Sequence, residues 1–365
     1  MDALKLLEKY VSMPSGSVDI DDVNALAEVI LDDIQSLGFE LKPHRAPGKP
    51  TIIEATYGHG PKKIMLIGHM DTVFPRHDFM PFRIEGDTAY GSGVMDMKGG
   101  IAIMLCALEK ALPGVDKDKY TLQILINPDE ELGSPSSQEL IAESAKTAAA
   151  CLSFEPARPS GALVCERKGV SSFTIKCRGV RGHAGMVYKS CHSAIQEICH
   201  RVERLYTLRD DARDISINVG SITGGTAENV VADYAEAHCE YRYFDMAYKQ
   251  EIADKIKSIC AEPGIEGCTT ELTFGPSHPA AKLSAGSQCL YNMAREIASN
   301  LGETATLEQT GGAGDISIAA AAGAPVLDGL GMEGAGAHTR EEFAKLNRMP
   351  YKIELVAQLI AGLTW

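Results

Sequence analysis

The sequence lacks any apolar run long enough to cross a membrane. Its longest apolar stretches, near Ile101–Leu108 and Ile316–Leu327, fall well short of the roughly 20 residues that a spanning helix needs. The amino terminus also lacks a basic segment followed by an apolar one, so we expect no signal peptide. We therefore expect no membrane association and a cytoplasmic location.

Positive charge is scarce as well, since 35 lysines and arginines face 49 acidic residues, which leaves a net charge of −14. Such a surface repels nucleic acid and anionic lipid, so we expect neither as a partner. The ten cysteines include no Cys-x-x-Cys pair, and a chain of 365 residues can fold without disulfide bonds. We expect reduced thiols, as in a cytoplasm.

The chain length predicts two domains, and the first of them has an α/β pattern. Ile64–Ile67 and Leu122–Ile126 are short apolar runs typical of buried strands, and Gly99–Leu112 between them has helical spacing. This alternation predicts a sheet with helices on both faces. Its ligand sites should lie where the strands end, near His69 and Asp129–Glu131.

From about Val170 to Phe274 the pattern changes to an α+β unit. The order strand, helix, strand, strand, helix, strand predicts a ferredoxin-like fold. We place the first domain at 1–169 and 281–365, interrupted by this insertion at 170–280. The expected elements are, in order, strand Ser172–Cys177, helix Ala194–Leu208, strand Ile215–Ile222, strand Val230–Phe244, helix Lys249–Cys260 and strand Thr269–Phe274.

Several motifs place metal-binding side chains at the ends of predicted strands. His69 can offer a ring nitrogen to a metal while Asp71 accepts its other N–H, although many such histidines are structural. In Gly91–Gly100 the glycines let the backbone turn and bring Asp96 close to other groups. Alone, Asp96 could equally be an acidic residue at a helix N-terminus.

Adjacent carboxylates follow the strand that ends near Asn127. In Asn127–Ser134, the adjacent carboxylates of Asp129–Glu131 point different ways, so one can bind a metal while its neighbour faces the substrate. A solvated acidic turn is the alternative, but like charges at the tip of a core strand repel unless a cation lies among them. Glu155 follows another apolar strand, and His338 lies in a glycine-rich loop.

Together these motifs supply two histidines and at least three carboxylates. Imidazole nitrogen and carboxylate oxygen suit zinc, with cobalt or manganese as substitutes. Three carboxylates nearly balance two dications, which favours a two-metal site.

The motifs resemble, in order, those of the glutamate carboxypeptidase, aminoacylase and acetylornithine deacetylase family of co-catalytic zinc hydrolases. The resemblance runs from about Met65 to Phe343 and implies a zinc-exopeptidase-like domain, a mixed sheet flanked by helices, interrupted by a lid and dimerisation domain. The matching segments are GHMDTVF, GSGVMDMKGG, NPDEELGS, FEP, RGHAG, the GGxxD pattern of Gly311–Asp315, and GAHTREEF.

Position by position, the resemblance implies two Zn²⁺ ions. His69 and Glu155 would hold one ion, Glu131 and His338 the other, and Asp96 would bridge both. In such proteins the peptide bond after the bridging aspartate is often cis.

The resemblance also implies catalytic roles. Asp71 would orient His69, and Glu130 would be the general base that takes a proton from the attacking water and passes it to the leaving amine. His183 matches a lid histidine that helps to stabilise the oxyanion and, in dimeric relatives, reaches the neighbouring subunit's site. A structural histidine is the alternative.

Substrate binding is implied for Asn229 and Arg242 in the insertion, where relatives bind the substrate's carboxylate. A structural salt bridge would explain Arg242 as well. His278-Pro279 departs from the arginine-proline of the glutamate-specific branch, which leaves selectivity for glutamate open, although Pro325–Gly331 resembles that branch.

The leading hypothesis is a zinc carboxypeptidase or dipeptidase that acts on small peptides as a homodimer formed through the lid. An N-acyl-amino-acid deacylase with the same site is the nearest alternative. A non-catalytic metal-binding scaffold is a third, but it would not need Glu130.

Overall fold

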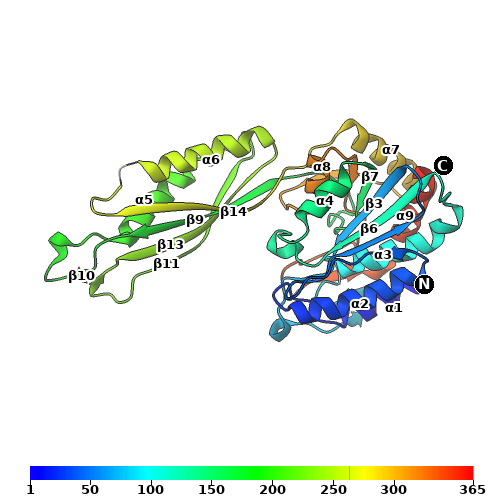
Figure 1. The fold of residues 1–365 in the computed structure, drawn as a ribbon, viewed down its shortest axis with the longest axis horizontal. Coiled ribbons are helices and arrows are strands. Elements are labelled where there is room, and N and C mark those ends of the chain that lie inside the picture. Colours follow the sequence, from blue (N-terminus) through cyan, green and yellow to red (C-terminus); the bar gives the residue numbers. More distant parts are fainter. Residues whose placement is uncertain (263, 365) are drawn as a thin grey trace. The chain divides into compact units, whose positions relative to one another are not determined.

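The computed structural model describes residues 1–262 and 264–364, which form two compact units (Figure 1). The first unit comprises Met1–Glu166, Ala281–Thr310 and the residues from Gly314 on. The second comprises Arg167–Ala280 with Gly311–Ala313, and it contains the predicted insertion, 170–280. The insertion's role as a lid stays a prediction.

The first unit is built on a mixed sheet with the order β1-β2-β6-β3-β7-β16. The strands β6, β3, β7 and β16 pair in parallel, whereas β2 runs antiparallel to β6 and β1 antiparallel to β2. The predicted mixed α/β architecture is confirmed. The strands are β1 (Glu40–Leu41), β2 (Ile53–Tyr57), β3 (Lys62–His69), β6 (Tyr120–Asn127), β7 (Ala148–Ser153) and β16 (Val326–Leu327).

Helices cover both faces of this sheet (Figure 1). Because successive strand residues point to opposite faces, Ile64 and Leu66 pack in one apolar core while Met65 and Ile67 pack in another. The first core includes α1 (Ala3–Val11), α2 (Ile20–Ser36), α3 (Lys98–Ala111), α7 (Ala285–Asn300) and α9 (Met349–Leu363), and the second includes α4 (Gln138–Ala145) and α8 (Ile316–Ala321).

Shorter elements complete the first unit. A small sheet has the order β17-β18-β5-β4, and a separate pair joins β15 to β8. These strands are β4 (Arg83–Glu85), β5 (Thr88–Tyr90), β8 (Leu163–Arg167), β15 (Leu307–Thr310), β17 (Gly334–Ala335) and β18 (Phe343–Lys345), and the short 3₁₀ helices of the unit are η1 (Arg76–Asp78), η2 (Leu112–Gly114), η3 (Glu130–Leu132) and η5 (Leu346–Arg348).

The second unit is an antiparallel sheet with the order β11-β13-β9-β14 and two helices. Numbered in chain order among these four strands, the order is second, third, first, fourth, the ferredoxin-like arrangement that the sequence predicts. Alternate residues of β13 are buried, as its period-two pattern predicts. The elements are β9 (Gly169–Arg178), β10 (Gly182–His183), η4 (Tyr188–Ser190), α5 (Ala194–Tyr206), β11 (Ser216–Gly224), β12 (Val230–Val231), β13 (Tyr234–Tyr243), α6 (Met246–Ala261) and β14 (Thr269–His278).

The prediction of one continuous strand over Val230–Phe244 is wrong. The segment forms two strands, β12 and β13, with a break at Ala232 and Asp233. At the break, the carbonyl of Ala232 accepts from the Ala194 N–H at 2.8 Å and that of Asp233 from the Gly179 N–H at 3.0 Å. The chain therefore bends, and β12 pairs with β10 instead of joining the main sheet.

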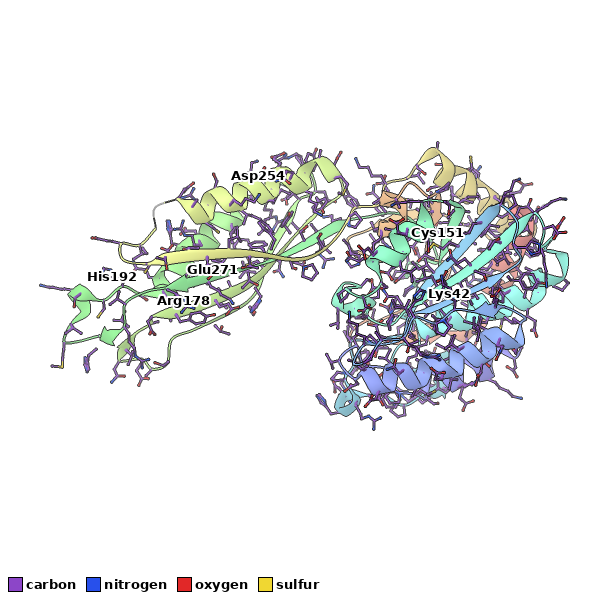
Figure 2. The ribbon with its side chains drawn as sticks, viewed as in Figure 1. Lys42, Cys151, Arg178, His192, Asp254 and Glu271 are labelled. Atoms are coloured by element: carbon purple, nitrogen blue, oxygen red, sulfur yellow. The ribbon has the colours of Figure 1, made fainter. Side chains whose placement is uncertain are left out.

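All ten cysteines lie within the described residues and are free thiols, as the sequence predicts. Cys151, for example, which Figure 2 labels, is fully buried in strand β7. No helix within residues 1–262 and 264–364 combines the length and apolar character that a bilayer span requires.

Candidate metal centre

The parallel strands β3, β6 and β7 bring three predicted site segments to one edge of the sheet. His69 ends β3 and pairs in register with Asn127, the last residue of β6. The turn η3 after β6 carries Glu130 and Glu131, and Glu155 follows β7. Parallel strands end at the same edge, so residues far apart in the chain converge there.

Asp96 reaches this edge from the loop that precedes α3. Gly93 in this loop has φ +77°, and a Cβ atom there would lie 2.8 Å from Thr72 Cγ2, so only glycine fits without rearrangement. The Asp96–Met97 peptide bond is cis, which confirms the expectation from the resemblance.

His69 lies between two carboxylates. Its Nε2 atom is 3.3 Å from Asp96 Oδ1 and 3.6 Å from Glu155 Oε1. The His69 side chain is almost fully buried. The structure thus brings together the three residues predicted to surround one ion.

His338 lies between the other pair of carboxylates. Its Nε2 atom is 3.1 Å from Glu131 Oε2 and 3.5 Å from Asp96 Oδ2. It is carried by the loop between β17 and β18, and its side chain is half-exposed. Asp96 therefore presents one oxygen to each histidine, and His69, Asp96 and Glu131 each offer a ligand atom within 4.8 Å of the others.

The histidines and Asp96 stabilise one another's charged forms. Burial would raise the pKa of Asp96, but hydrogen bonds with His338 and His69 outweigh burial and lower it. The hydrogen bonds with Asp96 and Glu131 raise the pKa of His338 to about 10. The negatively charged carboxylate of Asp96 thus lies between the two histidines.

The remaining carboxylates are crowded. Burial raises the pKa of Glu130, and so do the charges of Glu155 and Glu131, although His69 acts in the opposite direction. Burial also raises the pKa of Glu131 against the hydrogen bond from His338. Buried carboxylates this close repel unless cations lie among them, so the donor set fits a divalent metal.

Asp71 joins several parts of the site. Its carbonyl oxygen is 3.1 Å from His69 Nδ1, and its carboxylate Oδ1 is 3.4 Å from the same nitrogen. The carboxylate also accepts from the backbone N–H of Glu130 at 3.1 Å and of Glu131 at 3.2 Å, and from Ser17 Oγ at 2.6 Å. Asp71 thus fixes the turn with the two glutamates in addition to facing the histidine.

Two further buried carboxylates lie around the site without having been predicted as site residues. Glu342 accepts three backbone N–H groups from the loop that carries Asp96. Asp315 accepts from Asn127 Nδ2 at 2.6 Å and from Ser134 Oγ. Both lie in quoted motifs, GAHTREEF and GGxxD, but a motif alone does not tell which of its side chains turn inward.

The predicted substrate residues lie in the second unit. His183 and Asn229 are exposed neighbours, since His183 pairs with Val230 and the Asn229 carbonyl accepts from the Ala184 N–H at 3.0 Å.

Arg242 does not lie beside His183 and Asn229. It lies near the far end of β13, where its Nε and Nη2 donate to Glu240 at 2.8 and 3.1 Å and its Nη1 donates to the Gly311 carbonyl at 2.7 Å. The contacts with Glu240 form a salt bridge, and substrate binding by Arg242 stays a prediction.

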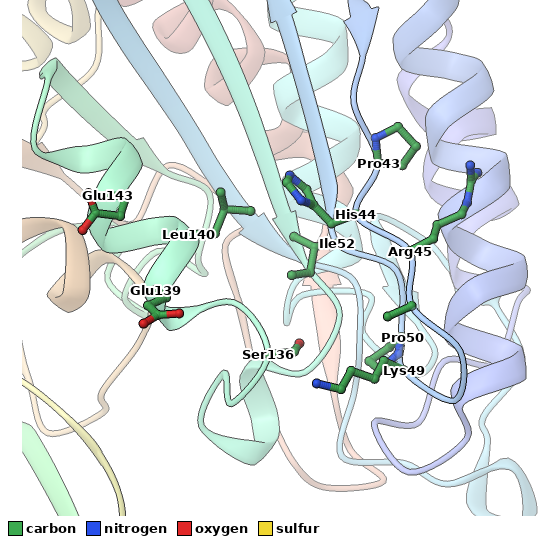
Figure 3. Close-up of a pocket in the computed structure, with 11 residues that line it drawn as sticks. Pro43, His44, Arg45, Lys49, Pro50, Ile52, Ser136, Glu139, Leu140 and Glu143 are labelled. Atoms are coloured by element: carbon green, nitrogen blue, oxygen red, sulfur yellow. The ribbon is translucent and has the colours of Figure 1, made fainter.

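A separate pocket of about 720 Å³ lies between the 43–52 loop and α4 (Figure 3). The basic His44 and Arg45 on its wall are already paired, with Glu54 at 2.7 Å and Glu28 at 2.6 Å. None of the predicted ligands is among its described lining residues.

Comparison with known proteins shows the family of the chain. The model of peptidase family M20/M25/M40 matches residues 65–362. The chain belongs to this peptidase family. It is 31% identical to carboxypeptidase G2 of Pseudomonas sp. (strain RS-16), covering 99% of this chain and 89% of that protein. Membership identifies this M20 peptidase as a hydrolase.

A second curated relative and one solved structure extend the comparison. Succinyl-diaminopimelate desuccinylase of Ehrlichia canis (strain Jake) is 28% identical, covering 72% of this chain and 73% of that protein. The crystal structure of an M20 family metallo-carboxypeptidase from Sulfolobus solfataricus superposes with a TM-score of 0.78 at 15% identity, covering 100% of this chain and 99% of that one. At that identity the likeness shows the fold alone.

Proposed function

We propose that this M20 peptidase is a metal-dependent carboxypeptidase or dipeptidase that cleaves an amide bond beside a free carboxylate. The proposal depends on the position of Asp96. Its Oδ1 lies 3.3 Å from His69 Nε2, and its Oδ2 lies 3.5 Å from His338 Nε2. The similarity to carboxypeptidase G2 over nearly the whole chain supports this substrate class.

The donor set suits Zn²⁺, with Co²⁺ or Mn²⁺ as substitutes. His69 and Glu155 would hold one ion, Glu131 and His338 the other, and Asp96 would be shared. When bound, the pair of ions would supply Lewis acidity, which lowers the pKa of water and polarises a carbonyl.

Glu130 is the residue proposed to move the proton. Its backbone N–H donates to the carboxylate of Asp71 at 3.1 Å, which fixes the turn that carries it. The carboxylate takes a proton from the attacking water and donates it to the nitrogen of the leaving amine. A scaffold that only held metal would not need this residue.

The decisive test is Glu130→Gln, with Glu139→Gln as the matched control because Glu139 is an exposed glutamate on α4. With zinc supplied, Glu130→Gln should lose at least ~10²-fold in kcat while keeping its metal content. Glu139→Gln should match the unaltered protein. Unchanged turnover in Glu130→Gln would refute the mechanism.

A deacylase acting on N-acyl amino acids is the second candidate. It is favoured by the similarity to the desuccinylase relative. Relative kcat/KM on dipeptides, folyl-glutamate and N-acetyl amino acids separates the two candidates.

The second unit is proposed to form a homodimer. Its strand β11 lies at the edge of the sheet, and Ile195 and Ile222, the latter on β11, are exposed by 41% and 47%. An exposed strand edge with apolar neighbours favours pairing with another chain. Sedimentation at several protein concentrations tests this proposal, and a monomer throughout would contradict it.

A further inference from the structure

Glu342 is a buried carboxylate at the base of the loop that carries His338. It is 1% exposed and directly precedes β18, four residues after the histidine. Its neighbour Glu341 is exposed, so the two glutamates differ in surroundings while sharing the same chemistry and the same loop.

Both carboxylate oxygens of Glu342 accept hydrogen bonds from backbone N–H groups of one loop. Oε2 accepts from the Gly93 N–H at 3.0 Å, and Oε1 accepts from the N–H groups of Met95 and Asp96 at 2.9 and 3.0 Å. Bonds from N–H groups to a carboxylate are roughly twice as strong as neutral ones. Three such bonds fix the loop at the residue whose side chain faces both histidines.

Glu342 therefore links the two segments that meet at the second predicted ion. One segment presents Asp96 and the other presents His338, and the two are far apart in the chain. Side chains that orient ligands in this way typically change metal affinity by roughly 10–100-fold when they are mutated.

We propose that Glu342 is a positioning residue of the metal centre: its carboxylate holds the Gly91–Met97 loop so that Asp96 meets His338 and Glu131 in ligating geometry. This inference rests on the metal binding in the proposed function. A merely structural role for Glu342 would lower the stability of the metal-free protein and leave its metal affinity unchanged.

The test compares Glu342→Gln with Glu341→Gln, which makes the same charge change on the same loop. Glutamine keeps the shape, but it turns an NH₂ group toward a backbone N–H in place of an acceptor. The full chain is stripped of metal and titrated with Zn²⁺ against a chromophoric chelator, and the thermal unfolding of the metal-free protein is recorded beside it.

Glu342→Gln should bind at least one Zn²⁺ about 10–100-fold more weakly, whereas Glu341→Gln should stay within about twofold of the unaltered protein. Unchanged affinity in Glu342→Gln overturns the proposal, whether or not the metal-free protein is less stable. If Glu342→Gln does not fold, Glu342→Asp decides in its place. Aspartate keeps the charge but is one methylene too short for all three donors, so weaker Zn²⁺ binding is expected and equal binding overturns the proposal.

Two outcomes separate the positioning role of Glu342 from the catalytic role of Glu130. If the unaltered chain binds zinc and hydrolyses its substrate while Glu342→Gln binds zinc equally well, only the positioning role is wrong. If Glu130→Gln keeps full activity while Glu342→Gln loses zinc, the proposed mechanism is wrong and the positioning role stands.

Discussion

Glu54 is a carboxylate whose ionised form is stabilised by three neighbours in the first unit. Its oxygens lie 2.7 Å from His44 Nε2 and 3.2 Å from Lys42 Nζ, and they accept from Gln123 Nε2 at 2.9 Å. Burial raises the pKa of Glu54, but the hydrogen bonds with His44, Lys42 and Gln123 together outweigh it and lower the pKa below its usual value.

A pH dependence follows from the lowered pKa of Glu54. Between its folded and unfolded pKa values the unfolded chain binds more protons, so stability is fully present above about pH 4.3 and is lost as the pH falls through the folded pKa. Glu54→Gln should be less stable by about 2 kcal/mol at pH 7. Urea unfolding should show this difference shrinking from pH 5 to pH 3, and a difference independent of pH would contradict the assignment.

The residues of the candidate site could be predicted from the sequence only in part. His69, Glu131 and Glu155 follow apolar strands, so their convergence could be inferred from strand order. Glu342 could not, because no local pattern separates it from Glu341, and only the tertiary structure shows that one faces inward and the other faces solvent.

The helix α3 packs closely against the end of β7 because a glycine, Gly100, lies at the contact. A Cβ atom at Gly100, in the first turn of the helix, would lie 2.0 Å from the carbonyl oxygen of Phe154, and Phe154 directly precedes the predicted ligand Glu155. The close approach of helix and strand therefore positions both Asp96 and Glu155.

Gly100→Ala should be destabilising although alanine favours helix by about 1 kcal/mol over glycine. The added methyl must displace backbone beside Glu155, at a cost of about 1–3 kcal/mol. Gly114→Ala is the control, because a Cβ atom there meets nothing within 4 Å. Denaturant unfolding of both variants measures the effect, and equal stabilities would show that the backbone yields freely.

The longer elements could be predicted from periodicity, and the short ones could not. The helix α5 begins at Ala194 as predicted, and β6 contains the predicted run Leu122–Ile126. The strands β5 and β18 are three residues each and pair across a long stretch of chain, Phe343 with Tyr90, so neither shows a local period. The His338 loop depends on this pairing and was predicted from its motif alone.

The molecule has separate apolar cores in its two units, so the units should respond separately to mutation. The second unit also contains a buried ion pair between Arg201 and Glu197. Arg201 Nε donates to Glu197 Oε1 at 2.7 Å, and the same carboxylate accepts from the Ile265 N–H at 2.6 Å and from Thr270 Oγ1 at 2.7 Å. Both side chains of the pair are almost fully buried.

Glu197→Gln should destabilise the second unit by about 3–5 kcal/mol, because it leaves Arg201 buried without its charged partner. Glu203→Gln, an exposed glutamate on the same helix, is the control. Differential scanning calorimetry should show one transition shifted down in Glu197→Gln and the other unmoved. If every unfolding transition shifted to the same extent, the two units would unfold as one, which would contradict the prediction.

Five side chains, those of His69, Asp96, Glu131, Glu155 and His338, are proposed to hold two metal ions, with Asp96 shared between them. The most direct measurement is the metal content per chain, by elemental mass spectrometry after equilibration with Zn²⁺, for the unaltered protein and for Asp96→Asn. Two ions are expected in the unaltered protein and at most one in Asp96→Asn. An unaltered protein that retains no metal, or an Asp96→Asn variant that retains both ions, would contradict this proposal.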